Sequence, residues 1–456
     1  MAAWREYLAE NESAWYEEVL ELLRIPSIST DPERVGDVAA TAEWVAARMK
    51  KAGIPEVEIV AGPGHPLVTG QWIVPNKPRV LIYGHYDVQP VEPLELWISP
   101  PFEPTVRDGK IYARGSGDMK ANLLNVLHAV EAFAKTDGEP PVSLIFLFEG
   151  EEEIGSPNLP AYVEANKEKL ACDVVISADS GVAGPDVPSL TVGLKGLAGC
   201  QIDIKTGERD MHSGMYGAMV ANANQVAAKL AASFHTADGA VAIEGFYDTV
   251  VPLNDDDERE IARASAEETP ILEESGAFAY WGEAGYTPAE RAYARPTVDI
   301  NGMWGGFTGE GGKTVTPAEA HIKVTCRLVP DQDPLEIVEL VRAHVAKHIL
   351  PGVEWEVTPS QGQAYPYRLP QDHPVLAKAS QVMEESFGRP PVYVRSGGSV
   401  PITAAFKKSL NAWSVSFAFS QPGNNSHAPN EWFRVEDLAR GRRGNYRLIE
   451  LLAEAE

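Results

Sequence analysis

Short apolar runs alternate with helical repeats over about the first 190 residues, and this alternation favours a layered α/β fold. The run Val80–Tyr83 is typical of a buried strand, whereas Leu123, Leu124 and Leu127 recur at helical spacing. The pattern predicts helices over 13–24, 37–52 and 121–133, and strands over 56–60, 79–84, 142–148 and 173–178.

The pattern changes near residue 195. Strands are expected over 197–205, 296–303, 320–328 and 353–358, with helices over 218–233 and 334–348. That order, βαββαβ, is the ferredoxin-like arrangement. A long acidic segment, 236–295, separates its halves, and we expect it to be partly helical and packed against a neighbour.

Beyond residue 363 the α/β pattern returns, with helices over 375–387 and 399–407, a final helix from Val435, and strands over 391–395 and 413–418. The smaller unit is therefore inserted into the larger one. We expect residues 1–194 and 363–456 to form one α/β domain and residues 195–362 to form the insertion.

Composition narrows the function classes. The chain has 65 acidic and 39 basic residues, and its net charge of −26 makes nucleic-acid binding unexpected, because phosphate backbones would be repelled. No stretch reaches the roughly 18 apolar residues of a membrane helix. The acidic N-terminal sequence lacks the features of a secretory signal, so we expect a cytoplasmic protein without membrane partners. Cys172, Cys200 and Cys326 are far apart and indicate neither a disulfide framework nor a thiolate zinc site.

Acidic residues and histidines follow several predicted strands. In "GHYDVQP", His85 and Asp87 lie two positions apart and would share a face of an extended segment. Similar positions are held by Asp118 at a helix start, Glu149, Glu151, Glu152 and Glu153 in "EGEEEIGS", Asp179 in "SADSG", and His427 in "NNSHAP". Ligands in open α/β sheets bind beyond the carboxyl ends of the strands, so these groups can converge.

Carboxylates that lie within a few ångströms of one another repel unless a cation offsets them. Two histidines with carboxylates suit zinc, manganese or cobalt, and the number of candidates fits two metals with a bridging carboxylate better than one zinc. Each piece alone has an ordinary explanation: a hydrogen-bonded His-x-Asp pair, a solvated acidic loop, a helix cap at Asp118, or a surface histidine at 427. The joint occurrence favours the metal site.

These residues, together with "GSGDMKAN", "DMHSGMYG", "RLVPDQDP", "RSGGSVP" and "NNSHAPNE", resemble the M20 metallopeptidases, within them the cytosolic dipeptidase and carnosinase branch. The resemblance covers nearly the whole chain. It implies a catalytic αβα domain with its metal site at the C-terminal ends of the strands. It also implies that the inserted domain is a lid through which two chains form a homodimer.

The resemblance also implies roles for individual residues. Asp118 would bridge two divalent ions, most simply zinc with manganese or cobalt as alternatives. The remaining ligands would be His85 and Asp179 for one ion, and Glu153 and His427 for the other. Asp87 would orient His85. Glu152 would be the general base that takes a proton from the metal-bridging water.

Substrate contacts follow from the same resemblance. His212 of the partner subunit would stabilise the oxyanion. Arg327 would hold a terminal carboxylate through its guanidinium, with further contacts from Thr314, Gly398 and Ser399. Near "SQGQAYPY" the chain has Gln361 and Gln363 where related enzymes have a histidine, so the substrate pocket can differ from theirs.

We therefore expect a metal-dependent enzyme that hydrolyses dipeptides or short peptides with a free C-terminal carboxylate. The alternative on the same scaffold is a deacylase of N-acyl amino acids, because the attacked amide would be the same. A non-catalytic peptide-binding protein would have lost a ligand or the base, and all of these residues are present.

Overall fold

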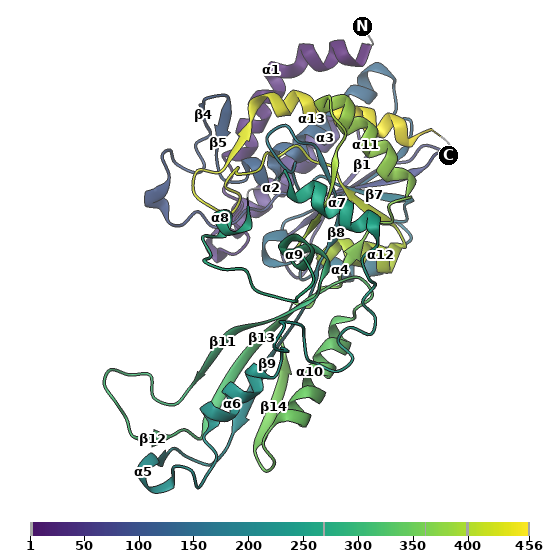
Figure 1. The fold of residues 1–456 in the computed structure, drawn as a ribbon. Helices are drawn as coiled ribbons and strands as arrows, with labels where there is room; N and C mark the ends of the chain where they lie inside the picture. Colours follow the sequence, from purple (N-terminus) through teal and green to yellow (C-terminus); the bar gives the residue numbers. More distant parts are fainter. Residues whose placement is uncertain (1–2, 268–269, 361, 398–400, 455–456) are drawn as a thin grey trace.

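Six strands form the sheet at the centre of the larger lobe (Figure 1). The computed structural model describes residues 3–267, 270–360, 362–397 and 401–454. Strands β6, β3, β7 and β17 run parallel, and β2 and β1 extend the sheet in antiparallel fashion. Their spatial order is β1 (Glu56–Val60), β2 (Leu67–Trp72), β6 (Ser143–Glu149), β3 (Arg79–His85), β7 (Val174–Ser177) and β17 (Trp413–Ser416).

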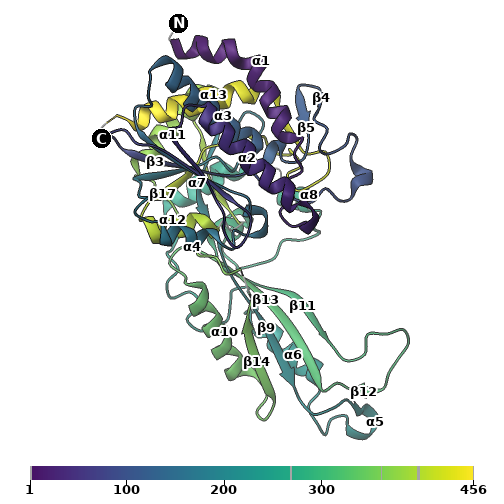
Figure 2. The same cartoon turned by 180° about the vertical axis from the view of Figure 1, so that it is seen from behind.

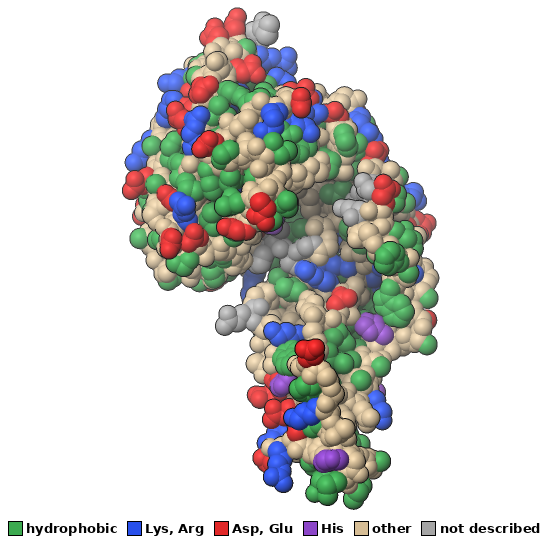
Figure 3. All heavy atoms as spheres, turned by 90° about the vertical axis from the view of Figure 1, so that its left-hand side faces the viewer, with side chains coloured by type: hydrophobic (Ala, Val, Ile, Leu, Met, Phe, Trp, Pro, Cys, Tyr) green, Lys and Arg blue, Asp and Glu red, His purple; other side chains and the backbone are tan. Residues whose placement is uncertain are grey.

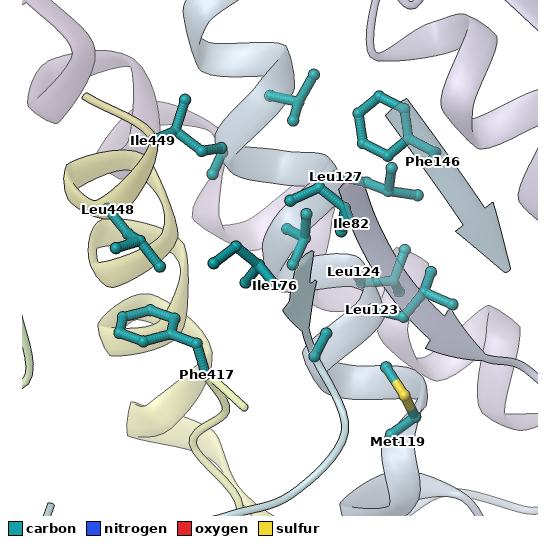
Figure 4. Close-up of a cluster of buried hydrophobic side chains, with 14 of the residues drawn as sticks. Ile82, Met119, Leu123, Leu124, Leu127, Phe146, Ile176, Phe417, Leu448 and Ile449 are labelled. Carbon is teal, nitrogen blue, oxygen red and sulfur yellow. The ribbon is translucent and has the colours of Figure 1, made fainter. Parts of the chain in front are cut away.

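Helices cover both faces of this sheet, which gives the expected αβα layers. Val80 and Ile82 of β3 belong to one core, whereas Leu81 and Tyr83 belong to the core on the opposite face. Figure 4 shows Ile82 beside Leu127 in the first core. The helices of the first face are α1 (Ala3–Leu23), α2 (Val35–Lys51), α3 (Ala121–Thr136), α11 (Pro374–Phe387) and α13 (Val435–Leu452); those of the second are α4 (Leu159–Ala165) and α12 (Pro401–Leu410). Burial on both faces explains why β3 is a continuous apolar run.

The second lobe is a four-stranded antiparallel sheet whose core includes α6 and α10. Along the chain its elements are β9 (Gly196–Lys205), α6 (Ala223–Ala232), β11 (Thr297–Gly305), β13 (Glu319–Leu328), α10 (Pro334–His348) and β14 (Glu354–Pro359). The spatial order β14-β9-β13-β11 agrees with the predicted ferredoxin-like arrangement. Helix α6 begins later than predicted because the side chain of Asn222 caps it by accepting the N–H of Gln225.

The described part of the acidic segment 236–295 contains the helices α7 (Asp255–Ser265), α8 (Ile271–Ser275) and α9 (Pro288–Ala294). Helix α7 lies against β16 (Val392–Ser396) of the larger lobe. There Asp257 forms ion pairs with Arg368 and Arg395. The segment is therefore partly helical and packs against a neighbouring element, as expected.

The chain passes between the lobes at two adjacent points. Strand β8 (Ser189–Leu194) leads into β9, and the return passes through Ala364 to β15 (Tyr367–Arg368). Leu197 and Ala364 exchange backbone hydrogen bonds of 2.7 and 2.9 Å. These points lie near the domain boundaries that we propose, after residues 194 and 362. Among the described residues, no helix has the length and apolar character needed to cross a membrane.

Candidate metal centre

The predicted metal ligands lie at the carboxyl edge of the larger sheet. His85 is the last residue of β3, Asp179 follows β7, and the loop after β17 carries His427. Asp118 lies in the turn Ser116–Lys120, directly before α3. Because parallel strands end at the same edge, the fold brings together side chains that are far apart in the sequence.

Two groups of potential ligands share one carboxylate. The first contains His85, Asp118 and Asp179, and the second contains Asp118, Glu153 and His427; within each group the ligand atoms lie within 4.8 Å of one another. Nε2 of His85 lies 3.1 Å from Oδ1 of Asp118, and Nε2 of His427 lies 3.0 Å from Oδ2. The two oxygens of Asp118 thus face different groups, as a carboxylate that bridges two ions must.

The electrostatics of this cluster favours bound cations. Burial and the charge of Asp118 raise the pKa of Asp179 to about 7. Hydrogen bonds to Asp118 and Glu153 raise the pKa of His427 to about 10. Burial opposes the protonation of His85, but its hydrogen bonds to Asp118 and Asp87 outweigh burial and raise its pKa. Protons thus offset the crowded carboxylates, and divalent ions can replace them, since three carboxylates with two imidazoles suit zinc, manganese or cobalt.

Asp87 connects His85 to the loop that carries Glu152 and Glu153. Nδ1 of His85 lies 3.1 Å from the backbone carbonyl oxygen of Asp87 and 3.4 Å from Oδ1 of the same residue. The backbone N–H groups of Glu152 and Glu153 donate to the Asp87 carboxylate at 3.3 and 3.1 Å. Strand β3 ends at His85, so the loop, and not the alternation along a strand, sets this contact. A carboxylate on the outer nitrogen of a ligand histidine fixes the orientation of the ring.

Glu152 is a member of neither ligand group among the described residues. Burial, with the nearby charges of Asp179, Glu153 and Asp118, raises the pKa of Glu152 to about 9. A carboxyl group that is not a ligand, yet lies among the ligands, can bind and release a proton there.

Two other acids of the run 149–153 hold this loop in place. Tyr83 and Ser156 donate hydrogen bonds to Glu149 at 2.7 and 2.8 Å, and burial raises the pKa of Glu149 to about 7. The side chain of Glu151 accepts hydrogen bonds from the N–H of His65 and from Asn158. Both carboxyl groups therefore support the loop and belong to neither ligand group among the described residues.

The loop that carries His427 has an uncommon backbone conformation. His427 has a φ of 62°, in the left-handed region that favours glycine. The side chain of Asn424 accepts the N–H of Ser426 at 3.1 Å and shapes the loop before His427. A non-glycine residue in this conformation, at the edge of a ligand cluster, is consistent with a functional constraint.

Glu431 is a supporting residue that the sequence reasoning missed. It is fully buried, and its carboxylate accepts hydrogen bonds from Arg114 at 2.7 Å and from the backbone N–H groups of Gly115, Gly117 and Asp118 at 2.8 to 3.0 Å. It therefore fixes the turn that presents Asp118. The only signal for it was its place in "NNSHAPNE", because a single acid in a loop shows no periodicity.

The predicted substrate contacts are not all brought to the metal ligands. His212 is exposed in β10 (Met211–His212), which pairs with β12 (Val315–Thr316) next to Thr314. Figures 1 and 2 both show β12 and α5 (Ser213–Tyr216) at the tip of the second lobe, far from the larger sheet. Arg327 is on β13 and lines a cavity between the second lobe and the acidic segment. Gly398 and Ser399 lie outside the described residues.

The chain is similar to known proteins in sequence and in fold. A family model described as "Peptidase family M20/M25/M40" matches residues 81–451. The chain is 28% identical over 445 residues to "Cys-Gly metallodipeptidase dug1" of Schizosaccharomyces pombe, covering 91% of each chain. It is 27% identical over 366 residues to "Beta-Ala-His dipeptidase" of Homo sapiens, covering 78% of this chain and 71% of the relative. The crystal structure of an M20 family metallo-carboxypeptidase, Sso-CP2 from Sulfolobus solfataricus, is similar with a TM-score of 0.81 and 32% identity, covering 96% of this chain and 99% of that one.

Proposed function

Because this chain belongs to peptidase family M20/M25/M40, we propose that it is a metal-dependent dipeptidase that acts on dipeptides or short peptides with a free C-terminal carboxylate. The observation that carries this proposal is the pair of ligand groups that share Asp118, with Glu152 beside them. Support for the substrate class comes from two similar proteins, which are named for dipeptides, Cys-Gly and Beta-Ala-His.

The proposed ligands divide between two ions. His85 and Asp179 would hold one, Glu153 and His427 the other, and Asp118 would contact both. When bound, two divalent ions polarise a peptide carbonyl and increase the acidity of water, and zinc is our first choice, with manganese or cobalt as alternatives.

Glu152 performs the proton transfers. Two bound divalent ions would lower the pKa of Glu152 through their positive charge, so that its carboxylate would take a proton from the attacking water and later deliver it to the leaving amine. Asp87 keeps His85 in place and also binds the N–H of Glu152, so one carboxylate aligns a ligand and the base together. The position of Glu152 is therefore fixed relative to the metal ligands.

His212 acts from a second copy of the chain. Its place at the tip of the second lobe removes it from the metal ligands of its own chain. Exposed apolar side chains lie next to it, including Met215, Tyr216 and Met219. We expect these side chains to be covered in a homodimer formed through the lid, in which the imidazole of His212 donates to the oxyanion at the partner's site. Thr314 would accompany it.

Arg327 binds the terminal carboxylate of the substrate. Its guanidinium can donate two parallel hydrogen bonds to a carboxylate. Gly398 and Ser399 remain proposed contacts to the same group, in line with the "RSGGSVP" sequence.

The proposal is tested by hydrolysis of a substrate panel. Metal-stripped protein is assayed on dipeptides and on N-acetyl amino acids, before and after addition of Zn²⁺, Mn²⁺ or Co²⁺. We expect dipeptide cleavage that returns only with metal. Cleavage of the acetyl compounds alone would move the function to deacylation, and no cleavage of either class would contradict an enzymatic function.

A further inference from the structure

Two cavities share the lining residue Gly397, and one of them borders the proposed metal ligands. One, of about 420 Å³, is lined by Asp118 and Asp179. The other, of about 360 Å³, lies between β11 and β13 of the second lobe and the acidic segment 236–295. Gly397 lines both cavities. A peptide whose scissile bond lies at the ligand cluster can therefore extend past Gly397 into the second cavity.

The charged residues that line the second cavity are four cations and two acids: Lys195, Arg291, Arg295, Arg327, Glu283 and Asp299. Arg327 and Lys195 line it, and the ammonium group of Lys195 donates to the carbonyl oxygen of Arg291 at 2.9 Å. Burial lowers the pKa of Lys195 to about 8; the charges of Arg327 and Arg295 act in the same direction, and Asp299 opposes them. Figure 3 shows Lys and Arg side chains gathered in the hollow between the two lobes. The excess of cations over acids in this lining suits a carboxylate.

One wall of the second cavity is apolar and aromatic. It is formed by Ile271 and Leu272 of α8 and by Tyr280 and Trp281 of the following loop. Tyr280 and Trp281 are 52% and 75% exposed. Large aromatic side chains beside a cavity, left in contact with water, are a common mark of a ligand-binding surface.

Hydrogen bonds hold the loop that presents these aromatic residues in place. Arg295 donates two hydrogen bonds to the carboxylate of Glu283, at 2.9 and 2.8 Å. Arg291 donates to the carbonyl oxygen of Trp281 at 3.3 Å, and the N–H of Ala284 donates to the carbonyl oxygen of Asp238 at 2.9 Å. The wall is therefore a built surface that can discriminate between side chains.

We propose that this second cavity is the subsite for the C-terminal residue of the substrate and that it selects a large apolar or aromatic side chain there. The inference rests on the proposed dipeptidase function. Arg327 and Lys195 hold the terminal carboxylate, and the side chain packs against Tyr280 and Trp281. Specificity is then set by the acidic segment, which supplies none of the metal ligands.

The test compares Ala-Phe with Ala-Gly. We expect the wild-type protein to have a kcat/KM about tenfold or more higher on Ala-Phe than on Ala-Gly, and in Trp281→Ala and Tyr280→Ala we expect the ratio of these two kcat/KM values to fall toward one. Phe278→Ala is the matched control, because Phe278 is fully exposed in the same loop and does not line the cavity. Equal losses on both dipeptides, or no loss on Ala-Phe, would overturn the inference.

A binding measurement separates this inference from the proposed function. Calorimetric titration of metal-loaded Glu152→Gln protein with the same two dipeptides needs no turnover. We expect tighter binding of Ala-Phe than of Ala-Gly, lost on the further substitution Trp281→Ala and kept with Phe278→Ala. If the wild-type protein cleaves no dipeptide, the proposed function fails, whereas equal affinities for the two dipeptides overturn the subsite itself.

Discussion

Nε2 of His427 lies 3.0 Å from Oδ2 of Asp118, although 309 residues separate the two in the sequence. The other oxygen of Asp118 is 3.1 Å from Nε2 of His85. One carboxylate thus joins the first strand-end motif of the chain to a loop near its C-terminus, and the proposed two-metal site depends on it.

Substitution of the ligands should change the metal content in steps. We expect Asp118→Ala to lose both ions, because both groups include this residue, and His427→Ala to keep about one ion per chain, since the other group stays complete. Elemental analysis after dialysis measures this. Full metal content in Asp118→Ala would contradict the bridging role.

Glu152→Gln should separate catalysis from metal binding. Because Glu152 is in neither ligand group, the variant should keep its metal while kcat falls roughly 10²- to 10⁴-fold. Metal content and dipeptide turnover are measured on the same preparation. A variant that keeps full activity with metal bound would show that the base is another residue.

The trans role of His212 can be tested by mixing two inactive variants. A mixed dimer of Glu152→Gln and His212→Ala has one complete site, because the His212→Ala chain keeps its own Glu152 and receives His212 from its partner. Random subunit exchange should restore about a quarter of the wild-type activity. If His212 acts within its own chain, mixing restores nothing. Light scattering on the same samples reports the dimer.

Glu431→Gln should destabilise the protein. The change leaves the buried Arg114 without its charge partner and places an amide against backbone donors, which costs roughly 3–5 kcal/mol. Denaturant unfolding of metal-free protein measures the free energy directly. Glu436→Gln is the control, since that side chain is 60% exposed. Equal stabilities of the two variants would contradict a structural role for Glu431.

A buried ion cluster predicts a pH dependence away from the metal site. Burial opposes ionisation of Glu18, but hydrogen bonds from His128 and Lys51 and the charge of Arg48 outweigh it and lower the pKa of Glu18 to about 2. In the unfolded chain the pKa of this group is near 4.5. A carboxyl group whose pKa is lower in the folded protein stabilises the fold at pH values above 4.5, and this stabilisation is lost as the pH falls toward 2.

We therefore expect the wild-type protein to have a larger free energy of unfolding than Glu18→Gln near pH 6. The difference between the two proteins should become smaller below about pH 4.5. Denaturant titrations at a series of pH values measure the gap. Glu17→Gln is the control, because the side chain of Glu17 is exposed. A gap that does not change with pH would contradict the assignment.

The layers of the fold were predictable because the buried strands have an unbroken apolar sequence. The strands over 79–84 and 142–148 could be predicted without any knowledge of tertiary contacts. Strand β8, with the sequence "SLTVGL", was missed because its pairing with β15 and β16 depends on residues distant in the sequence. Helix α1 begins at Ala3, well before the predicted start at 13, because Trp4 and Leu8 extend its buried face.

The sequence indicated which side chains lie together where they follow strand ends, and it missed contacts that depend on the paths of loops. His85 and Asp179 adjoin buried strands, so the topology rule was enough to place them together. Nothing in the local sequence reveals that Glu431 accepts the N–H of Asp118. The aromatic wall at Tyr280 and Trp281 could likewise not be predicted, since the hydrophobic residues of the acidic segment around it do not recur at a clear spacing.

The hydrogen-bonded pair Leu197 and Ala364 has an evolutionary consequence. Because the backbone nitrogen of one lies 2.7 Å from the carbonyl oxygen of the other, deletion of everything between them leaves two chain ends that a short turn can join. The second lobe is thus an insertion whose two chain connections lie side by side. Gain, loss or exchange of this lobe during evolution would require no change in the strand order of the six-stranded sheet.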